Sequence, residues 1–189
     1  MTTRLKAMAA AVVMAVLSLS AIPASAGSEK APAADALAER FAYLSTHGNS
    51  NCSRQFMESI AAMSPMMRLR GSCCSPMDLH RYGEQVEGLE AYAGLPTIPP
   101  DPYDIPAGLA AELTASYGLD LTAVEQAAYD YAMANSNEGG PCCCRCWRWE
   151  VYGGLAKRLI REHGFAGEQI AELWDLSDGC GGDSHAHHT

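Results

Sequence analysis

The placement of the cysteines constrains this chain more than any other feature. Of its eight cysteines, four crowd into the five positions from Cys142 to Cys146. Neighbouring cysteines such as Cys142 and Cys143 close only a strained ring if they are oxidised together. Some sulfurs of this segment must therefore pair with distant cysteines, stay free or bind a metal.

The composition of the rest of the chain favours helices. After residue 26 there are only three valines and five isoleucines, whereas alanine, leucine, glutamate and glutamine are plentiful. Residues that favour strands are thus scarce. The chain has 189 residues, of which 48% are apolar. We predict an all-α protein with one compact helical domain over residues 27–182 and a cysteine-rich centre at the helix ends.

Apolar spacing and capping signals locate the helices. Ser75 and Pro76 are expected to be the cap and the first residue of one helix. Thr122 and Glu125 form a capping box that opens another, and Gly164 ends a third with a Schellman cap. The expected helices cover residues 35–46, 52–63, 76–93, 106–117, 122–135, 147–163 and 167–176.

Two further features concern packing. Five prolines between Leu95 and Pro106 remove backbone donors and favour extended geometry, so this segment is predicted to be a rigid strap across the surface. Gly153 and Gly154 each weaken their helix by about 1 kcal/mol relative to alanine. Another element is therefore expected to pack closely against them.

Both ends of the chain lie outside the predicted domain. Arg4 and Lys6 precede an apolar run and the small residues Ala24-Ser25-Ala26, which predicts a secretory signal over residues 1–26. The protein is thus expected to be exported, to the bacterial periplasm or outside the cell, with no membrane anchor after cleavage. The net charge of −9 argues against a nucleic-acid partner. Residues 183–189 are predicted to be a disordered tail that contains His185, His187 and His188.

The segment Pro141–Trp147 carries the main chemical signal. Cys143 and Cys146 form a C-x-x-C pair, whereas Cys142, Cys144 and Cys146 alternate. The segment can therefore present two thiols for exchange or three thiolates for a metal. The positive end of the following helix is expected to lower the thiol pKa values. Alternating residues converge only if the segment is a loop, because residues of a helix are about 100° apart.

Four other cysteines are candidate ligands from separate places, all at expected helix ends or turns. If residues 52–63 are a helix, Cys52 points toward the core from its first turn. Glycines on both sides of Cys180 are expected to let the backbone approach a shared centre. Met77 and His80 could join Cys73 and Cys74 as soft donors for copper(I), but a solvated helix face explains them better. The additional candidate ligands are Cys73, Cys74, Cys52 and Cys180.

The segment from Cys142 to Cys146 carries a family resemblance, together with Tyr129 and Tyr131 before it and Asp178-Gly179-Cys180 after it. It resembles the CYCXC family of exported bacterial proteins and selenoproteins and, more distantly, the PCYCGC-motif proteins. The resemblance covers residues 125–182, and Cys143 replaces the tyrosine of the family motif. It implies export and a shared cysteine centre, with redox or soft-metal chemistry, and names no reaction.

These observations leave three hypotheses. The first is an exported binding protein that holds copper(I) or zinc on Cys142, Cys144 and Cys146. The second is a thiol-disulfide oxidoreductase, in which Cys143 or Cys146 attacks a thiol or disulfide partner protein. No βαβ pattern surrounds the C-x-x-C pair, which counts against this enzyme. The third is a structural or interaction protein stapled by disulfides.

Overall fold

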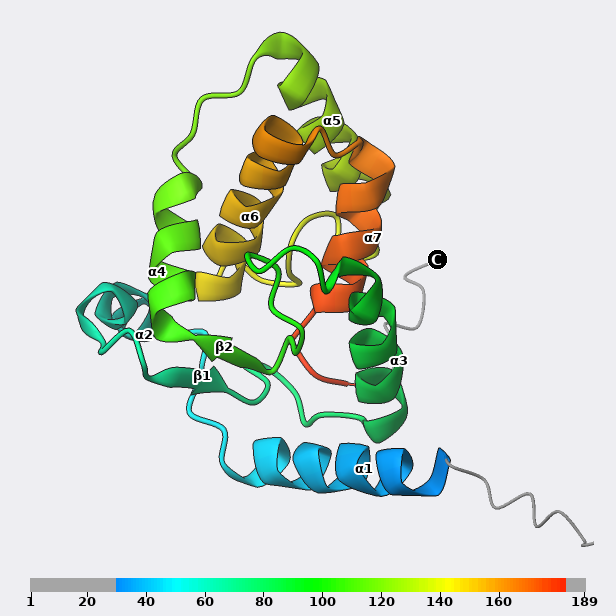
Figure 1. Cartoon of the computed structure of the whole chain (residues 1–189). Helices are drawn as coiled ribbons and strands as arrows, with labels where there is room; N and C mark the ends of the chain where they lie inside the picture. Colours follow the sequence, from blue (N-terminus) through cyan, green and yellow to red (C-terminus); the bar gives the residue numbers. More distant parts are fainter. Residues whose placement is uncertain (1–29, 183–189) are drawn as a thin grey trace, which may run out of the picture.

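The computed structural model describes residues 30–182 and is mainly helical, as predicted (Figure 1). Two short strands, which the sequence analysis missed, pair antiparallel. Short 3₁₀ turns follow two of the helices, at Ile60–Ala62 and Glu90–Tyr92. In chain order the helices and strands are α1 Lys30–Thr46, α2 Arg54–Ser59, β1 Arg68–Arg70, α3 Leu79–Leu89, β2 Asp104–Pro106, α4 Ala107–Ser116, α5 Ala123–Asn135, α6 Trp147–His163 and α7 Gly167–Ser177.

Helices α4 to α7 enclose the main core. Val151, Leu155 and Leu159 of α6 are fully buried, and α6 lies beside α4 in Figure 1. The close packing expected at Gly153 and Gly154 is confirmed: a Cβ atom on Gly154 would lie 1.9 Å from the carbonyl oxygen of α4 residue Leu113. Only glycine lets the two helix backbones come this near.

The predicted capping box of α5 is confirmed, and α6 ends at Gly164 as predicted. Thr122 and Glu125 form the capping box that begins α5. Gly164 ends α6 with a left-handed φ of 66°. The amide of Gly164 donates to the carbonyl of Ile160, which is the single bond of an αL cap and not the pair of bonds of the predicted Schellman cap. Local sequence signals thus set these boundaries.

The beginning of α3 differs from the prediction. Asp78, and not Ser75, caps this helix by accepting a hydrogen bond from the Arg81 amide. The segment Cys73–Pro76 is instead held by main-chain bonds to residues near the carboxyl end. Leu79, expected on the buried face, is 42% exposed at the first position of α3.

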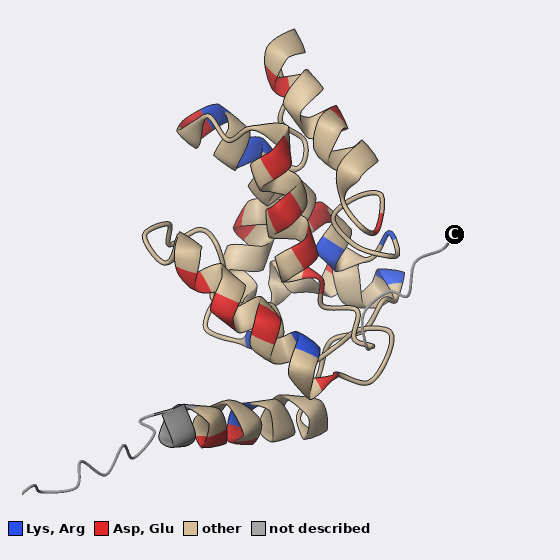
Figure 2. Ribbon diagram, turned by 90° about the vertical axis from the view of Figure 1, so that its right-hand side faces the viewer, with Lys and Arg blue, Asp and Glu red and all other residues tan. Residues whose placement is uncertain are grey.

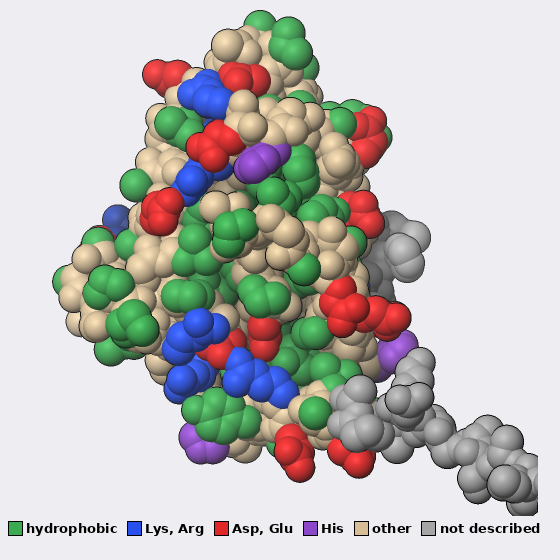
Figure 3. Space-filling model, in the orientation of Figure 1, with side chains coloured by type: hydrophobic (Ala, Val, Ile, Leu, Met, Phe, Trp, Pro, Cys, Tyr) green, Lys and Arg blue, Asp and Glu red, His purple; other side chains and the backbone are tan. Residues whose placement is uncertain are grey.

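The proline-rich segment 95–106 ends in β2, which pairs with β1 in the register Leu69↔Ile105. The carboxylate of Asp104 in β2 lies 2.7 Å from Arg68 Nε and 3.7 Å from Arg70 Nε, and it also pairs with Arg40 of α1. Figure 3 shows basic side chains gathered above α1. This ion network fastens the first helix to the strand pair.

A second, smaller core joins α1 to α3. Leu44 and Tyr82 are buried against Tyr103 of the strap, and Phe41 packs beside them. Figure 2 shows acidic residues on several helices, in keeping with the net charge of −9. In residues 30–182 no helix has the length and apolarity needed to cross a membrane. The predicted signal 1–26 and tail 183–189 lie outside the described residues.

Candidate metal centre

All eight cysteines meet in one group, although they come from four separate parts of the chain. Every one is a free thiol. Short sulfur–sulfur contacts connect the whole set, which we call the eight-cysteine cluster. The distances are 3.2 Å for Cys52–Cys74, 3.5 Å for Cys52–Cys144, 3.8 Å for Cys73–Cys74, 3.9 Å for Cys74–Cys143, 3.7 Å for Cys74–Cys144, 3.8 Å for Cys142–Cys146, 3.0 Å for Cys142–Cys180 and 2.6 Å for Cys143–Cys180.

The segment from Gly139 to Cys146 is an irregular loop, as the alternating cysteines require. Gly139 and Gly140 have φ values of 64° and 152°, which side chains rarely adopt. The hydroxyl of Ser136 accepts a 2.8 Å hydrogen bond from the Gly140 amide and fixes this bend. Helix α6 then begins at Trp147, with Cys146 as its N-cap residue. The bend directs successive sulfurs to different sides of the cluster.

The segment 179–182 joins the cluster through main-chain hydrogen bonds. The carbonyl of Cys180 accepts from the amides of Cys74 and Ser75 at 3.3 Å and 2.8 Å. The predicted role of the flanking glycines is confirmed, because a Cβ atom on Gly181 would lie 2.1 Å from the Ser75 carbonyl oxygen. At Gly179 a Cβ atom would lie 2.2 Å from the guanidinium carbon of Arg148.

The cluster extends from the interior to the surface. Cys142, Cys146 and Cys180 are buried, whereas Cys52 and Cys143 are exposed. Cys74 is also exposed, and Cys73 and Cys144 have intermediate burial. The prediction that Cys52 points inward from a helix is wrong, because α2 begins only after its cap Ser53. Solvent therefore reaches one end of the cluster and not the other.

Potential ligand sets overlap within the cluster. The sulfurs of each set lie within 4.8 Å of one another. Cys142, Cys144 and Cys146, expected to converge on one point, fall into different sets that share Cys146. The sulfur sets are Cys74-Cys143-Cys144-Cys180, Cys52-Cys73-Cys74, Cys52-Cys144-Cys146 and Cys73-Cys142-Cys146, and a further set joins Asp178 to Cys142 and Cys180.

Arg148 borders the buried end of the cluster, and the sequence analysis did not identify it. Its guanidinium is 0% exposed and donates to the carbonyl oxygens of Pro102 and Gly71 at 2.6 Å and 3.1 Å. Burial opposes its charged form, but nearby side chains, among them Cys73 and Cys142, outweigh burial and raise the pKa of Arg148. The only sequence signal was a basic residue on the apolar first turn of α6.

The thiols influence one another strongly. Hydrogen bonds from Cys142 and two other cysteines, with the charge of Arg148, lower the pKa of Cys73. Hydrogen bonds to neighbouring cysteines raise the pKa of Cys142, and burial raises that of Cys143. The expected lowering by the helix end is therefore wrong for these two. Ionised sulfurs this close repel one another, so full ionisation needs cations among them.

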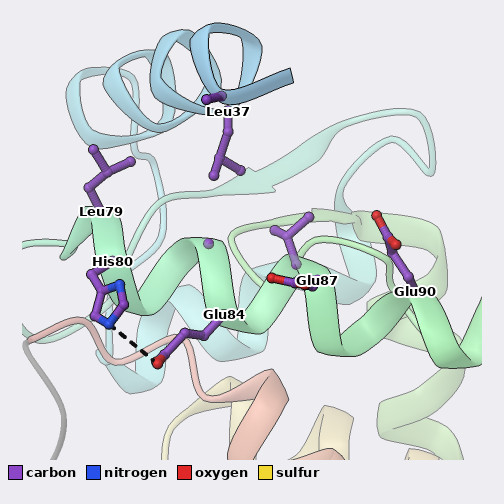
Figure 4. A pocket seen from close by; sticks show the side chains of 9 residues that line it. Leu37, Leu79, His80, Glu84, Glu87 and Glu90 are labelled. Atoms are coloured by element: carbon purple, nitrogen blue, oxygen red, sulfur yellow. Dashed lines mark ion pairs between the residues drawn. The ribbon is translucent and has the colours of Figure 1, made fainter. Parts of the chain in front are cut away.

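Two other sequence candidates have contacts outside this group. His80 is 87% exposed on α3, and its Nε2 lies 3.4 Å from Oε1 of Glu84 beside a shallow pocket (Figure 4). The sulfur of Met77 accepts a hydrogen bond from Ser45, and its side chain packs against the smaller core. His80 belongs to none of the ligand sets. The tail histidines His185, His187 and His188 lie outside the described residues.

Cys143 and Cys146, whose C-x-x-C spacing suggested a pair of thiols for exchange, each contact the sulfurs of other cysteines. The sulfur of Cys143 contacts those of Cys74 and Cys180, whereas the sulfur of Cys146 contacts that of Cys142. The two cysteines thus have different partners.

Comparisons with known proteins add no assignment. No family model, no curated protein and no solved structure matches this chain. The resemblance to the CYCXC family therefore remains a prediction drawn from the cysteine motif. The eight cysteines form a cluster that could hold a metal ion.

Proposed function

We propose that this protein is exported and binds soft metal ions of the copper(I) or zinc class in the eight-cysteine cluster. One observation carries the proposal: sulfurs from four distant parts of the chain lie within ligand-sharing distance of one another. Thiolates are the ligands that select copper(I) and zinc. A packing role alone does not require eight thiols at one point.

The surroundings of the cluster support metal binding. A metal ion withdraws charge from the thiolates and so removes the repulsion that keeps neighbouring thiols protonated. The buried sulfurs of Cys142, Cys146 and Cys180 would be shielded from oxidants in solution, and the exposed sulfurs of Cys52 and Cys143 give an ion a way in. The CYCXC-like motif fits the same interpretation.

The oxidoreductase hypothesis has less support. A C-x-x-C enzyme needs a low-pKa attacking thiol beside its resolving thiol. The pKa of Cys143 is raised by burial, and its contacts are with cysteines other than Cys146. We therefore propose a binding protein in preference to an enzyme.

The test uses protein recovered from the export compartment. Metal analysis and intact mass under non-reducing conditions are expected to show bound copper or zinc and free thiols. Cys144→Ser is expected to weaken metal binding at least tenfold, because Cys144 belongs to two ligand sets. The matched control replaces His185, His187 and His188 by alanine and should leave binding unchanged.

Two results would contradict the proposal. One is a protein with four disulfides and no metal, which would establish the stapled scaffold instead. The other is loss of binding in the histidine variant with full binding in Cys144→Ser. The amino terminus of the same sample tests export, because cleavage after Ala26 should leave Gly27 as the first residue.

A further inference from the structure

We infer that the eight-cysteine cluster binds several copper(I) ions in one thiolate-bridged assembly. This inference rests on the proposed function and specifies its ligand. The proposed function states neither how many ions bind nor their charge, and this inference specifies both.

The overlap of the ligand sets is the main argument. Cys146 belongs to the set of Cys52 and Cys144 and also to the set of Cys73 and Cys142. Cys74 and Cys180 are shared between sets in the same way. If each set holds an ion, each shared sulfur must bind two ions. Shared sulfurs are bridging thiolates, so the ions would form one cluster and not independent sites.

The geometry favours copper(I) over zinc. A structural zinc ion takes four ligands in a tetrahedron. Two separate zinc sites would therefore need the cysteines divided into two sets of four. In the described residues the only four-sulfur set is Cys74, Cys143, Cys144 and Cys180, and the other sulfur sets have three members. Three-sulfur sets with shared members suit copper(I), which soft thiolates select.

The charge of the site points the same way. Arg148 is the only Lys or Arg that is buried in the described part of the chain. A buried guanidinium is costly unless a negative partner lies beside it. Thiolates that bind monovalent ions and bridge between them keep a net negative charge, because eight thiolates outnumber the ions they hold. An anionic cluster beside Cys73 and Cys142 would provide the counter-charge for Arg148.

The binding step involves no electron transfer. Each thiol that binds releases its proton to solvent, and its sulfur forms bonds to copper(I). The metal must be supplied as copper(I), because copper(II) would oxidise the thiols. Exposed Cys52, Cys74 and Cys143 are the sulfurs at which an incoming ion first meets the cluster.

The test is an anaerobic titration of the full exported protein, reduced and metal-free, with copper(I) in the presence of a competing chelator. Native mass spectrometry counts the bound ions. We expect about five per chain, because eight sulfurs that each bridge two three-coordinate ions supply ligands for about that number. Binding should be cooperative, with little protein holding one or two ions.

The count distinguishes the inference from the proposed function. More than four ions require bridging, because eight sulfurs without bridging hold at most four two-coordinate ions. A count of one or two would overturn the bridged cluster and leave the proposed function standing, because eight sulfurs hold two three-coordinate ions without sharing. At three or four ions, X-ray absorption decides, because bridged ions lie close enough to show a copper–copper distance, and its absence would overturn the bridged cluster. Binding of neither copper(I) nor zinc would overturn both.

A pair of serine variants tests the sharing of sulfurs. Cys146→Ser removes a sulfur that belongs to two sets and should lose at least two ions, whereas Cys143 belongs to one set and Cys143→Ser should lose at most one. Circular dichroism checks that both variants keep their helices. Equal losses in two folded variants would contradict the assignment of Cys146 as a bridge, as would a larger loss in Cys143→Ser.

Discussion

The contact between α4 and α6 allows a stability prediction for Gly154→Ala. The new methyl carbon would lie 1.9 Å from the Leu113 carbonyl oxygen and 2.9 Å from the Tyr117 amide nitrogen. Both are backbone atoms, so no side chain can rotate away. Because real Cβ contacts begin near 3.0 Å, the helices must move apart by about 1 Å. Overpacking of this kind costs up to about 3 kcal/mol.

Alanine also favours the helix by about 1 kcal/mol relative to glycine. The net expectation is a loss of about 2 kcal/mol, which lowers Tm by roughly 4–8 °C for a chain of this size. Urea unfolding of the reduced, metal-free protein, followed by circular dichroism, measures the change. Gly94→Ala is the matched control, because a Cβ atom there meets nothing within 4 Å. A Gly154→Ala variant as stable as Gly94→Ala would refute the predicted backbone contact.

Two further predictions concern the ion network and the chain end. Burial opposes ionisation of Asp104, but hydrogen bonds from Arg68 and Arg40 lower its pKa. Its contribution to stability should therefore be complete above the unfolded-state pKa of about 3.9 and be lost as pH falls through the lower folded value. Asp104→Asn should cost about 2 kcal/mol at pH 7, and the difference from wild type in urea unfolding should shrink toward pH 2. A difference independent of pH would contradict this. Gly179→Ala should displace Cys180, because its methyl would overlap the Arg148 guanidinium, which hydrogen bonds to Pro102 and Gly71 hold in place. The variant should lower the copper(I) count by at least one, whereas Gly94→Ala should not. An unchanged count would show that the chain end tolerates the displacement.

Local signals in the sequence were sufficient for most helices. The scarcity of β-branched residues predicted a mainly helical chain, and the capping box at Thr122 and the glycine at Gly164 marked helix ends that the structure confirms. These signals work because capping satisfies backbone groups within a few residues. At Ser75 the same reasoning failed. Its amide donates to the Cys180 carbonyl, which is a partner that no local pattern indicates.

The sequence also identified all eight cysteines as chemically important and predicted the loop before α6. It did not predict the β1–β2 pair, whose two strands join segments more than thirty residues apart. The burial of Arg148 was missed for a related reason. A basic residue on a helix turn is ordinarily solvated, and only the packing of Gly71, Pro102 and Gly179 around it removes it from water.

The cysteine motif by itself determined that the sulfurs near the start of α6 need distant partners, a metal ion or a free state, because adjacent sulfurs cannot all pair locally. Which sulfurs lie close enough to share an ion was decided only by the tertiary structure. The bend at Gly139 and Gly140 places Cys142 and Cys144 in different ligand sets. Main-chain bonds between segments 73–76 and 179–182 then bring in the remaining partners. Sulfur bridging depends on distances of a few ångströms between residues distant in sequence, and folding alone sets those distances.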